Sequence, residues 1–340
     1  MKIGLTYDLR SDYLKRGYGE EETAEFDRDD TILALEETLQ SLGYETDRIG
    51  TAMDLMARLV AGDRWDMVFN IAEGLHGIAR EAQVPAILDV YDIPYTFSDP
   101  LVMSLTLHKG MTKHVAAACG YHTPAFLVVE KGGDTDAVAF DPPYFVKPAA
   151  EGTGKGITSA SVVYQKSELA AICNRLLSCY RQPVLVEQYF SGREFTVGIL
   201  GTGEDARSIG TMEVLLRPQA EDNVYSYQNK ENSEQLVDYR FIRPEEDPVV
   251  REAETTALGI WRALGCRDAG RIDLRCDDRG KPGFLEVNPL AGLHPQHSDL
   301  PIICGLIGLS YRELISRIVQ SASTRLKPAM GKQASKQCGS

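Results

Sequence analysis

Four side chains near the C-terminal end of the sequence have types and spacing that could do chemistry together: Arg271, Asp273, Glu286 and Asn288. Successive side chains of a β-strand alternate between its two faces, so Arg271 shares a face with Asp273, and Glu286 shares one with Asn288. If those faces met, two carboxylates and an amide oxygen would converge beside an arginine. Hard oxygen ligands of this kind suit Mg²⁺, which commonly also binds substrate phosphates.

Two short apolar segments, 271–275 and 284–289, must position these side chains. They are separated by the polar residues 276–283, which include Asp-Asp-Arg-Gly-Lys-Pro-Gly. This pattern predicts a β-hairpin. The alternative is a surface hairpin with solvated charges, and the residue pattern alone leaves both interpretations open.

A glycine-containing loop provides a second candidate site. The predicted strand 144–148 carries Lys147 at its end and is followed by Glu-Gly-Thr-Gly-Lys-Gly at 151–156. Three glycines let backbone N–H groups approach an anion closely. The loop matches neither the Walker pattern nor the dinucleotide fingerprint, and a plain hairpin turn is the alternative. Lys109 and Lys113 share one face of the predicted helix 103–120, where a solvated face is the alternative.

Composition limits the classes of protein that need to be considered. A chain of 340 residues is long enough for two or three domains. The net charge of −13 argues against a general nucleic-acid or anionic-membrane surface, so a phosphate site must be local. Seven cysteines without a Cys-x-x-Cys pair favour reduced thiols over disulfides or zinc. Neither a signal peptide nor a membrane span is evident, so we expect a cytoplasmic protein.

Hydrophobic periodicity predicts alternating strands and helices over the first 100 residues, which is typical of a parallel α/β layer. Residues 8–30 have the composition of an acidic loop, and 327–340 that of a mobile tail. The other predicted strands are 2–7, 66–71, 93–96, 183–190, 195–200 and 210–215, and the other predicted helices are 31–42, 54–61, 85–90, 166–180, 248–264 and 311–321.

The order and spacing of five fragments resemble the D-alanine–D-alanine ligase branch of the ATP-grasp superfamily, over residues from about 66 to 320. The fragments are Ile-Pro-Tyr-Thr-Phe-Ser at 93–98 with Lys109, Lys-Pro at 147–148 with Glu-Gly-Thr at 151–153, Val-Glu-Gln-Tyr-Phe-Ser-Gly-Arg-Glu-Phe-Thr-Val at 186–197, Gly-Arg-Ile-Asp at 270–273, and Glu-Val-Asn at 286–288.

The resemblance implies a mixed α/β (α+β) ATP-grasp fold with the nucleotide held between the second and third of three domains. The expected domains are 1–103, 104–195 and 196–325, followed by a tail, 326–340. ATP and two Mg²⁺ ions would be the cofactors. ATP would phosphorylate a carboxylate, and an amine would attack the acyl phosphate to form an amide. The partners would be small amino-acid-type substrates and a second copy of the chain, with no nucleic acid and no membrane.

The resemblance also assigns roles to individual residues. The residues expected to bind ATP are Lys109, Lys147, Glu151, Gly152, Gly154, Glu187, Tyr189 and Glu194, and those expected to bind the metal are Asp273, Glu286 and Asn288. The expected catalytic residues are Arg271, Lys230 and Thr153, and the expected substrate-binding residues are His76, Glu231, Gly292, His297 and Ser298.

The sequence departs from the family pattern where substrates are expected to bind. No single residue of 21–27 can be matched to the family's N-terminal glutamate, and the Gly-Glu-Asp-Gly run expected after His76 is missing. Glu231 replaces an expected aromatic residue and could attract a cationic second substrate. One extra residue, within His294-Pro295, precedes His297-Ser298. These departures argue against D-alanine as both substrates.

Two alternatives remain open at this point. One is a ligase that joins another amino acid, dipeptide or small acid to an amine. The other is a non-catalytic ATP-binding protein. A serine hydrolase based on 297–299 is excluded, because three consecutive residues cannot form the side-chain relay and the strand-turn-helix elbow is absent.

Overall fold

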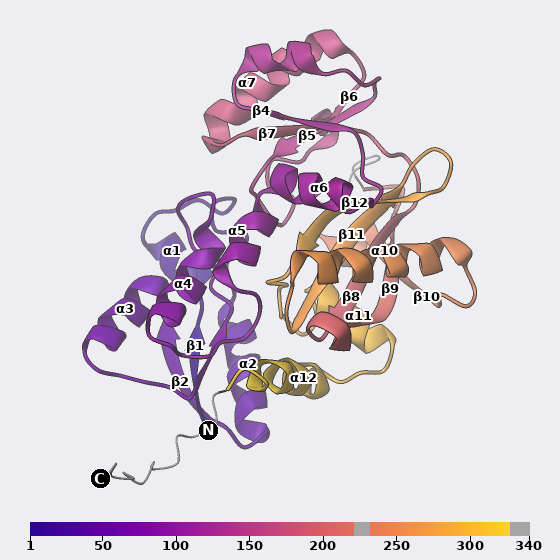
Figure 1. The fold of residues 1–340 in the computed structure, drawn as a ribbon. Coiled ribbons are helices and arrows are strands. Elements are labelled where there is room, and N and C mark those ends of the chain that lie inside the picture. The colour runs from indigo at the N-terminus through magenta and orange to yellow at the C-terminus, as the bar shows by residue number, and fades with distance from the viewer. Residues whose placement is uncertain (221–231, 327–340) are drawn as a thin grey trace, which may run out of the picture.

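A computed structural model describes residues 1–220 and 232–326, which form three β-sheets with helices packed against them (Figure 1). The first sheet is parallel, with β1 at its centre. Its strands are β1 (Lys2–Thr6), β2 (Glu45–Gly50) and β3 (Met67–Asn70), and the helices of this part of the chain are α1 (Arg10–Lys15), α2 (Asp29–Ser41), α3 (Ala52–Val60) and α4 (Gln83–Val90). The predicted parallel α/β layer is confirmed.

The second sheet is antiparallel and has the order β4-β7-β5-β6. Helix α7 packs against it, at the top of Figure 1. The elements are β4 (Phe126–Val129), β5 (Tyr144–Pro148), β6 (Val162–Val163), α7 (Leu169–Tyr180) and β7 (Val184–Gln188). Strand β5 has the predicted bounds, so Lys147 lies next to the end of a buried strand, as expected.

The third sheet is also antiparallel and has the order β10-β9-β8-β11-β12. Helix α10 covers one of its faces (Figure 1) and ends at Gly265, whose φ of 75° is left-handed. The elements are β8 (Glu194–Leu200), β9 (Arg207–Leu216), α9 (Ser233–Leu236), β10 (Val237–Ile242), α10 (Pro248–Leu264), β11 (Ala269–Cys276), β12 (Pro282–Asn288), α11 (Asp299–Leu306) and α12 (Tyr311–Ser323).

Three predictions of secondary structure were wrong. The expected loop 8–30 contains α1, and 93–96 contributes only an isolated bridge between Val68 and Tyr95. The expected helix 103–120 is two helices, α5 (Pro100–Leu107) and α6 (Lys109–Ala118). The chain leaves the helical conformation at His108, whose ring accepts a hydrogen bond from the Met111 N–H at 3.2 Å and caps α6.

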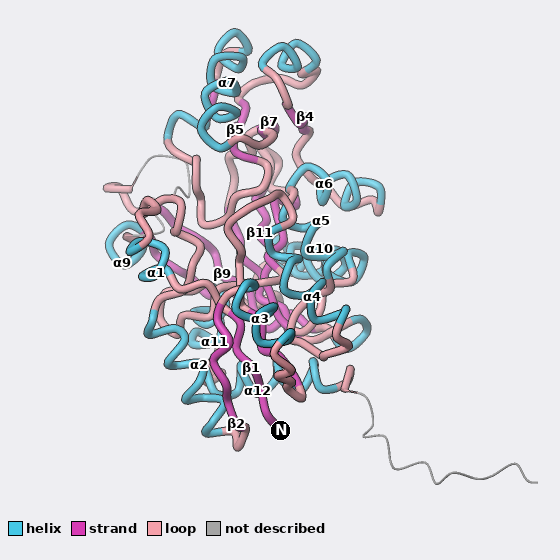
Figure 2. The backbone as a smooth tube through the Cα atoms, turned by 90° about the vertical axis from the view of Figure 1, so that its left-hand side faces the viewer, coloured by secondary structure: helices cyan, strands magenta, loops and turns pink. Residues whose placement is uncertain are grey.

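The end of the described chain packs against its beginning. Helix α12 lies beside α2 (Figure 2), and Leu314, Ile315 and Ile318 share one hydrophobic core with Ile32 and Leu35. The division into three domains stays a prediction, and its proposed boundary between residues 103 and 104 falls inside α5.

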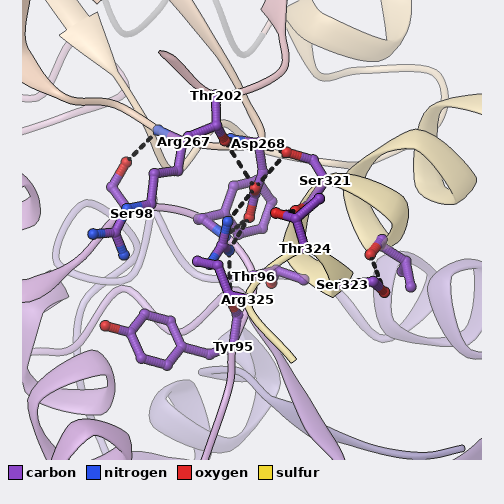
Figure 3. Close-up of polar contacts among 12 residues, drawn as sticks. Tyr95, Thr96, Ser98, Thr202, Arg267, Asp268, Ser321, Ser323, Thr324 and Arg325 are labelled. Carbon is purple, nitrogen blue, oxygen red and sulfur yellow. Dashed lines mark hydrogen bonds and ion pairs between the residues drawn. The ribbon is translucent and has the colours of Figure 1, made fainter. Parts of the chain in front are cut away.

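A polar cluster around Asp268 connects these parts of the chain (Figure 3). Asp268 is fully buried and accepts hydrogen bonds from the Phe97 N–H at 2.7 Å and the Ser321 hydroxyl at 2.7 Å. Arg325 donates to both carboxylate oxygens, at 2.8 and 2.6 Å, and also to the Tyr95 carbonyl at 2.8 Å. One carboxylate therefore joins the loop before α5, the start of β11 and the end of α12.

Candidate active site

The hairpin of β11 and β12 brings the four candidate side chains together. In its antiparallel register Arg271 pairs with Asn288, and Asp273 pairs with Glu286. The predicted hairpin and the predicted meeting of the two faces are both confirmed. A bulge follows Asp273, after which the register of the hairpin changes.

Asp273 is the centre of a buried polar network. Its carboxylate accepts hydrogen bonds from the Thr196 hydroxyl at 3.0 Å and the Asn288 amide at 3.4 Å, and it is ion-paired with Arg271. Arg271 also lies 3.4 Å from Asp299. Burial opposes the charge of Arg271, but the two aspartates outweigh it and raise its pKa above the ordinary value. The guanidinium is therefore fixed and permanently cationic.

The donor set at this hairpin fits Mg²⁺ in chemistry, because Asp273, Glu286 and Asn288 offer hard oxygen ligands. Within residues 1–220 and 232–326, no group of three or more His, Cys, Asp or Glu side chains is arranged to hold a metal. Two carboxylates and one amide would supply only part of a six-coordinate shell, which is usual for Mg²⁺ bound together with phosphates.

Lysines of helix α6 and strand β5 lie close to the same hairpin. Lys147 lies 2.8 Å from one oxygen of Glu187, and Lys113 lies 2.8 Å from the other. Lys109 and Lys147 are 3.5 and 4.0 Å from Glu286. Burial raises the pKa of Glu187, but the two lysines outweigh it and leave the pKa below its usual value. Positively charged lysines therefore lie next to the hairpin carboxylates that could hold a metal.

Lys113 is a buried residue for which helix spacing alone gave no function. Its ammonium donates hydrogen bonds to Thr123 at 2.9 Å and to the Phe284 carbonyl at 3.1 Å, and its side chain is fully buried. Burial lowers its pKa to about 8. It therefore connects α6 to β12 and holds Glu187 in place.

A small pocket of about 70 Å³ lies beside these lysines. Tyr189, Glu194 and Arg275 line it: Arg275 donates to the Tyr189 hydroxyl at 3.1 Å, lies 4.9 Å from its ring centroid and is 3.3 Å from Glu194. Phe145 stacks against Tyr189 with ring centroids 6.2 Å apart. Aromatic faces beside a carboxylate are suited to a purine and the hydroxyl groups of a ribose.

The glycine loop folds over the lysines with left-handed backbone at Thr153, Gly154 and Gly156, where φ is 53°, 75° and 74°. Lys109 donates a hydrogen bond to the Glu151 carbonyl at 2.5 Å. The Gly152 N–H donates to Glu25, in the N-terminal segment. A side chain at position 152 would come within 2.7 Å of that carboxylate. Gly152 is therefore needed for this close approach.

A larger cavity of about 500 Å³ unites most of the predicted site. Its lining includes Lys109, Glu151, Gly152, Thr153, Arg271, Glu286, Asn288, Gly292, His297 and Ser298. His76 is exposed and is not among the lining residues. The predicted catalytic Lys230 and substrate-binding Glu231 lie outside the described residues.

Four acidic residues at one end of this cavity had no role in the sequence-based prediction: Glu25, Asp27, Glu73 and Glu81. Glu25 pairs with Arg80 at 2.7 Å and lies 3.7 Å from Lys155. Among the described contacts, none of the other three forms an ion pair with Lys or Arg. Burial, together with the charge of Asp8, raises the pKa of Asp27 to about 8. The acidic run 20–30 was a visible signal, but composition could not show that it folds onto the cavity.

Replacing Asp27 by asparagine should make the pH profile of stability flatter. A carboxyl group with a pKa near 8 in the folded state holds a proton that the unfolded chain has already released, so it contributes stability at low pH. That contribution is lost as the pH rises from about 4 to about 8. Urea midpoints measured across this range should therefore fall more steeply for the native chain than for the variant. Parallel profiles would contradict the assignment.

His294 fixes the loop before α11. His294 accepts hydrogen bonds from the Gln296 and His297 N–H groups, each at 3.2 Å, and lies 3.3 Å from Asp30. The His294 N–H donates to the Ser298 hydroxyl at 3.0 Å. His294 thus anchors the loop to α2 and orients Ser298 within the cavity.

Comparisons with known proteins give one consistent result. Residues 118–320 match the family described as D-ala D-ala ligase C-terminus. The chain is 31% identical over 332 residues to a D-alanine–D-alanine ligase from Bordetella petrii, covering 96% of this chain and 93% of the relative. It is 33% identical to another from Syntrophotalea carbinolica, covering 86% and 90%.

Solved structures resemble the whole chain. A D-alanine–D-alanine ligase from Bacillus anthracis complexed with ATP superimposes with a TM-score of 0.71 at 22% identity, covering 96% of this chain and 98% of that one. A D-Ala:D-Ser ligase from Enterococcus faecalis gives 0.70 at 20% identity, covering 94% and 99%. At these identities the likeness establishes the fold, which is the ATP-grasp fold.

Proposed function

Because the chain belongs to the D-alanine–D-alanine ligase family, whose members are ATP-dependent carbon–nitrogen ligases, we propose that it activates a small amino-acid-type carboxylate and joins it to an amine. The observation that carries this proposal is the convergence of Arg271, Glu286 and Asn288 with Lys109 on one substrate-sized cavity. The chemistry of phosphoryl transfer consists mainly of positioning and neutralising charge, and these residue types do both.

The residues divide the work according to where they lie. Lys109 and Lys147 neutralise the phosphates, and the N–H groups of the glycine loop cover them. Asp273, Glu286 and Asn288 would hold Mg²⁺, which supplies further charge neutralisation when bound. Arg271, fixed between Asp273 and Asp299, holds the acceptor carboxylate and then the oxyanion formed as the amine attacks. No nucleophilic side chain is needed once the amine is held within a closed site.

The small pocket would hold the adenosine part of ATP. Tyr189 and Phe145 line it with aromatic carbon atoms that can pack against the purine, and Glu194 accepts hydrogen bonds from the ribose hydroxyls. Arg275 fixes both Tyr189 and Glu194. Glu187 and Lys147, which form an ion pair, also line this pocket.

The acidic end of the larger cavity favours a substrate that carries a positive charge. Asp27, Glu73 and Glu81 line it and form no described ion pair with Lys or Arg, and the charges of Arg80 and Lys109 only partly offset the burial that raises the pKa of Glu81 to about 7. Arg10 and Arg28 of the lining lie 3.6 Å from Glu20 and Asp30. A cationic group would supply the partner that these carboxylates lack. We therefore propose a cationic amino acid or amine as one substrate, in preference to D-alanine at both positions.

A screen of substrate pairs tests the proposed function. With ATP and Mg²⁺, pairs that include a cationic amino acid should give ADP and phosphate together with a product whose mass is the sum of the pair less water. ADP release from pairs of D-alanine alone should be slower. Tight ATP binding without ADP from any pair would favour the non-catalytic alternative instead.

Family membership also supports two Mg²⁺ ions, a homodimer and a cytoplasmic location as proposals. The homodimer predicts a particle of twice the chain mass in solution, which sedimentation can measure. Across the described residues, no helix is both long and apolar enough to cross a membrane.

A further inference from the structure

Arg80 is a buried cation that the proposed mechanism does not use. It begins the short helical turn Arg80–Ala82, which leads into α4, and only 6% of its surface is exposed. Burial of a cation is unfavourable unless its donors are all used. Here Glu25 and Glu151 more than offset that burial, and the pKa of Arg80 is raised above its ordinary value.

The guanidinium of Arg80 bridges two segments that are far apart in the sequence. One nitrogen donates to the Ala150 carbonyl at 2.8 Å, immediately before the glycine loop. Another donates to Glu25 at 2.7 Å and lies 3.8 Å from Glu151. Glu25 in turn accepts the Gly152 N–H. Arg80 and Glu25 therefore hold the first residues of the glycine loop at two successive points.

This geometry differs from that of a free substrate-binding carboxylate. Glu25 lines the cavity, but only 7% of its side chain is exposed and its charge is already met by Arg80 and Lys155. These two cations also lower its pKa in spite of its burial. Its local role is to accept a loop N–H group and to anchor a guanidinium.

We propose that Arg80 is a positioning residue that, through Glu25, holds the base of the glycine loop in its phosphate-covering conformation. The inference rests on the proposed function, because the loop is taken to cover the phosphates of ATP. A guanidinium suits this position, because two of its nitrogens donate separately, one to the Ala150 carbonyl and one to Glu25. Through Arg80 and Glu25, the N-terminal part of the chain would support the nucleotide site without contacting the nucleotide.

Replacing Arg80 by methionine should raise the KM for ATP about ten- to a hundredfold, the range expected when a hydrogen bond to a charged group is lost. The kcat at saturating ATP should change much less. Arg80→Lys keeps the charge but offers one donor nitrogen where the guanidinium uses two, so it should be intermediate. Arg58→Met is the matched control: it removes ion pairs to Asp47 and Asp63 away from the cavity, and KM should be unchanged.

Direct ATP binding separates this inference from the proposed function. Calorimetric titration with ATP and Mg²⁺, without amino acids, should show the same weakening in Arg80→Met, whether or not a productive substrate pair is known. In the double variant with Glu25→Gln, the loss should be no greater than in the larger single variant, because the two residues act as one unit. Unchanged affinity in folded Arg80→Met and Arg80→Lys, or additive losses, would overturn the inference. If Arg80→Met turned over substrates with an unchanged KM for ATP, the inference would also be overturned, but the proposed ligase function would still be supported.

Discussion

Replacing Arg271 by methionine is expected to lower kcat by about two to three orders of magnitude, the loss measured when a donor to a developing oxyanion is removed. Binding of ATP should be nearly unchanged, because Arg271 lies in the larger cavity and does not line the small pocket. Turnover is followed as ADP release with the best substrate pair, and ATP binding is followed by calorimetry.

Arg240→Met is the matched control for that experiment. Arg240 lies on β10 of the same sheet and pairs with Glu213, which keeps Arg193 at 2.6 Å when Arg240 is removed. Its kcat should stay within about twofold of the native value, since surface ion pairs contribute little. If Arg271→Met retained full activity, Arg271 would hold Asp273 and Asp299 in place without touching the reacting groups.

Replacing Asp268 by alanine is expected to reduce the free energy of unfolding by about 3–5 kcal/mol, the range for breaking a buried ion pair. The lower end is favoured because 24% of the Arg325 side chain is exposed. The variant would strand the Phe97 N–H and the Ser321 hydroxyl as well as Arg325. It would also place alanine at a φ of 64°, which aspartate tolerates better.

Denaturant unfolding measures this loss, with two comparison variants. Asp268→Asn keeps the shape and the left-handed backbone but removes the charge, so it should lose less stability than alanine. Asp278→Ala changes an exposed aspartate in the β11–β12 turn and should have almost no effect. Equal stability of Asp268→Ala and the native chain would show that the cluster in Figure 3 does not hold these segments together.

Local pattern was sufficient for the elements that position the chemistry. Strand β5 and helix α10 have the predicted bounds, and the hairpin register follows from its turn and its alternation. The local pattern failed at residue 108. The helical spacing of apolar residues continues through this position, although α5 ends there and His108 caps the new helix α6. The local pattern also missed β10, although Val237, Tyr239 and Phe241 alternate there with Asp238 and Arg240, and the pairing of β10 with β9 depends on tertiary context.

Residue type and order were enough to single out Lys109, Lys147, Asp273 and Glu286, which the structure brings close together. Residues that reach the site only through long-range folding could not be predicted. Nothing local to Glu25 or Arg80 shows that they meet the backbone of residues 150–152. Lys113 looked like part of a solvated face because helix spacing cannot reveal which strand covers that face.

The packing of α12 on α2 has a consequence for how the chain folds during synthesis. The core of the N-terminal sheet includes Leu314 and Ile318, so more than 300 residues must be made before that core is complete. We expect the first hundred residues to remain loosely packed until then. A chain shortened to residue 308 should bind a hydrophobic dye at its N-terminal part while the second sheet, which shares no core with α12, folds normally.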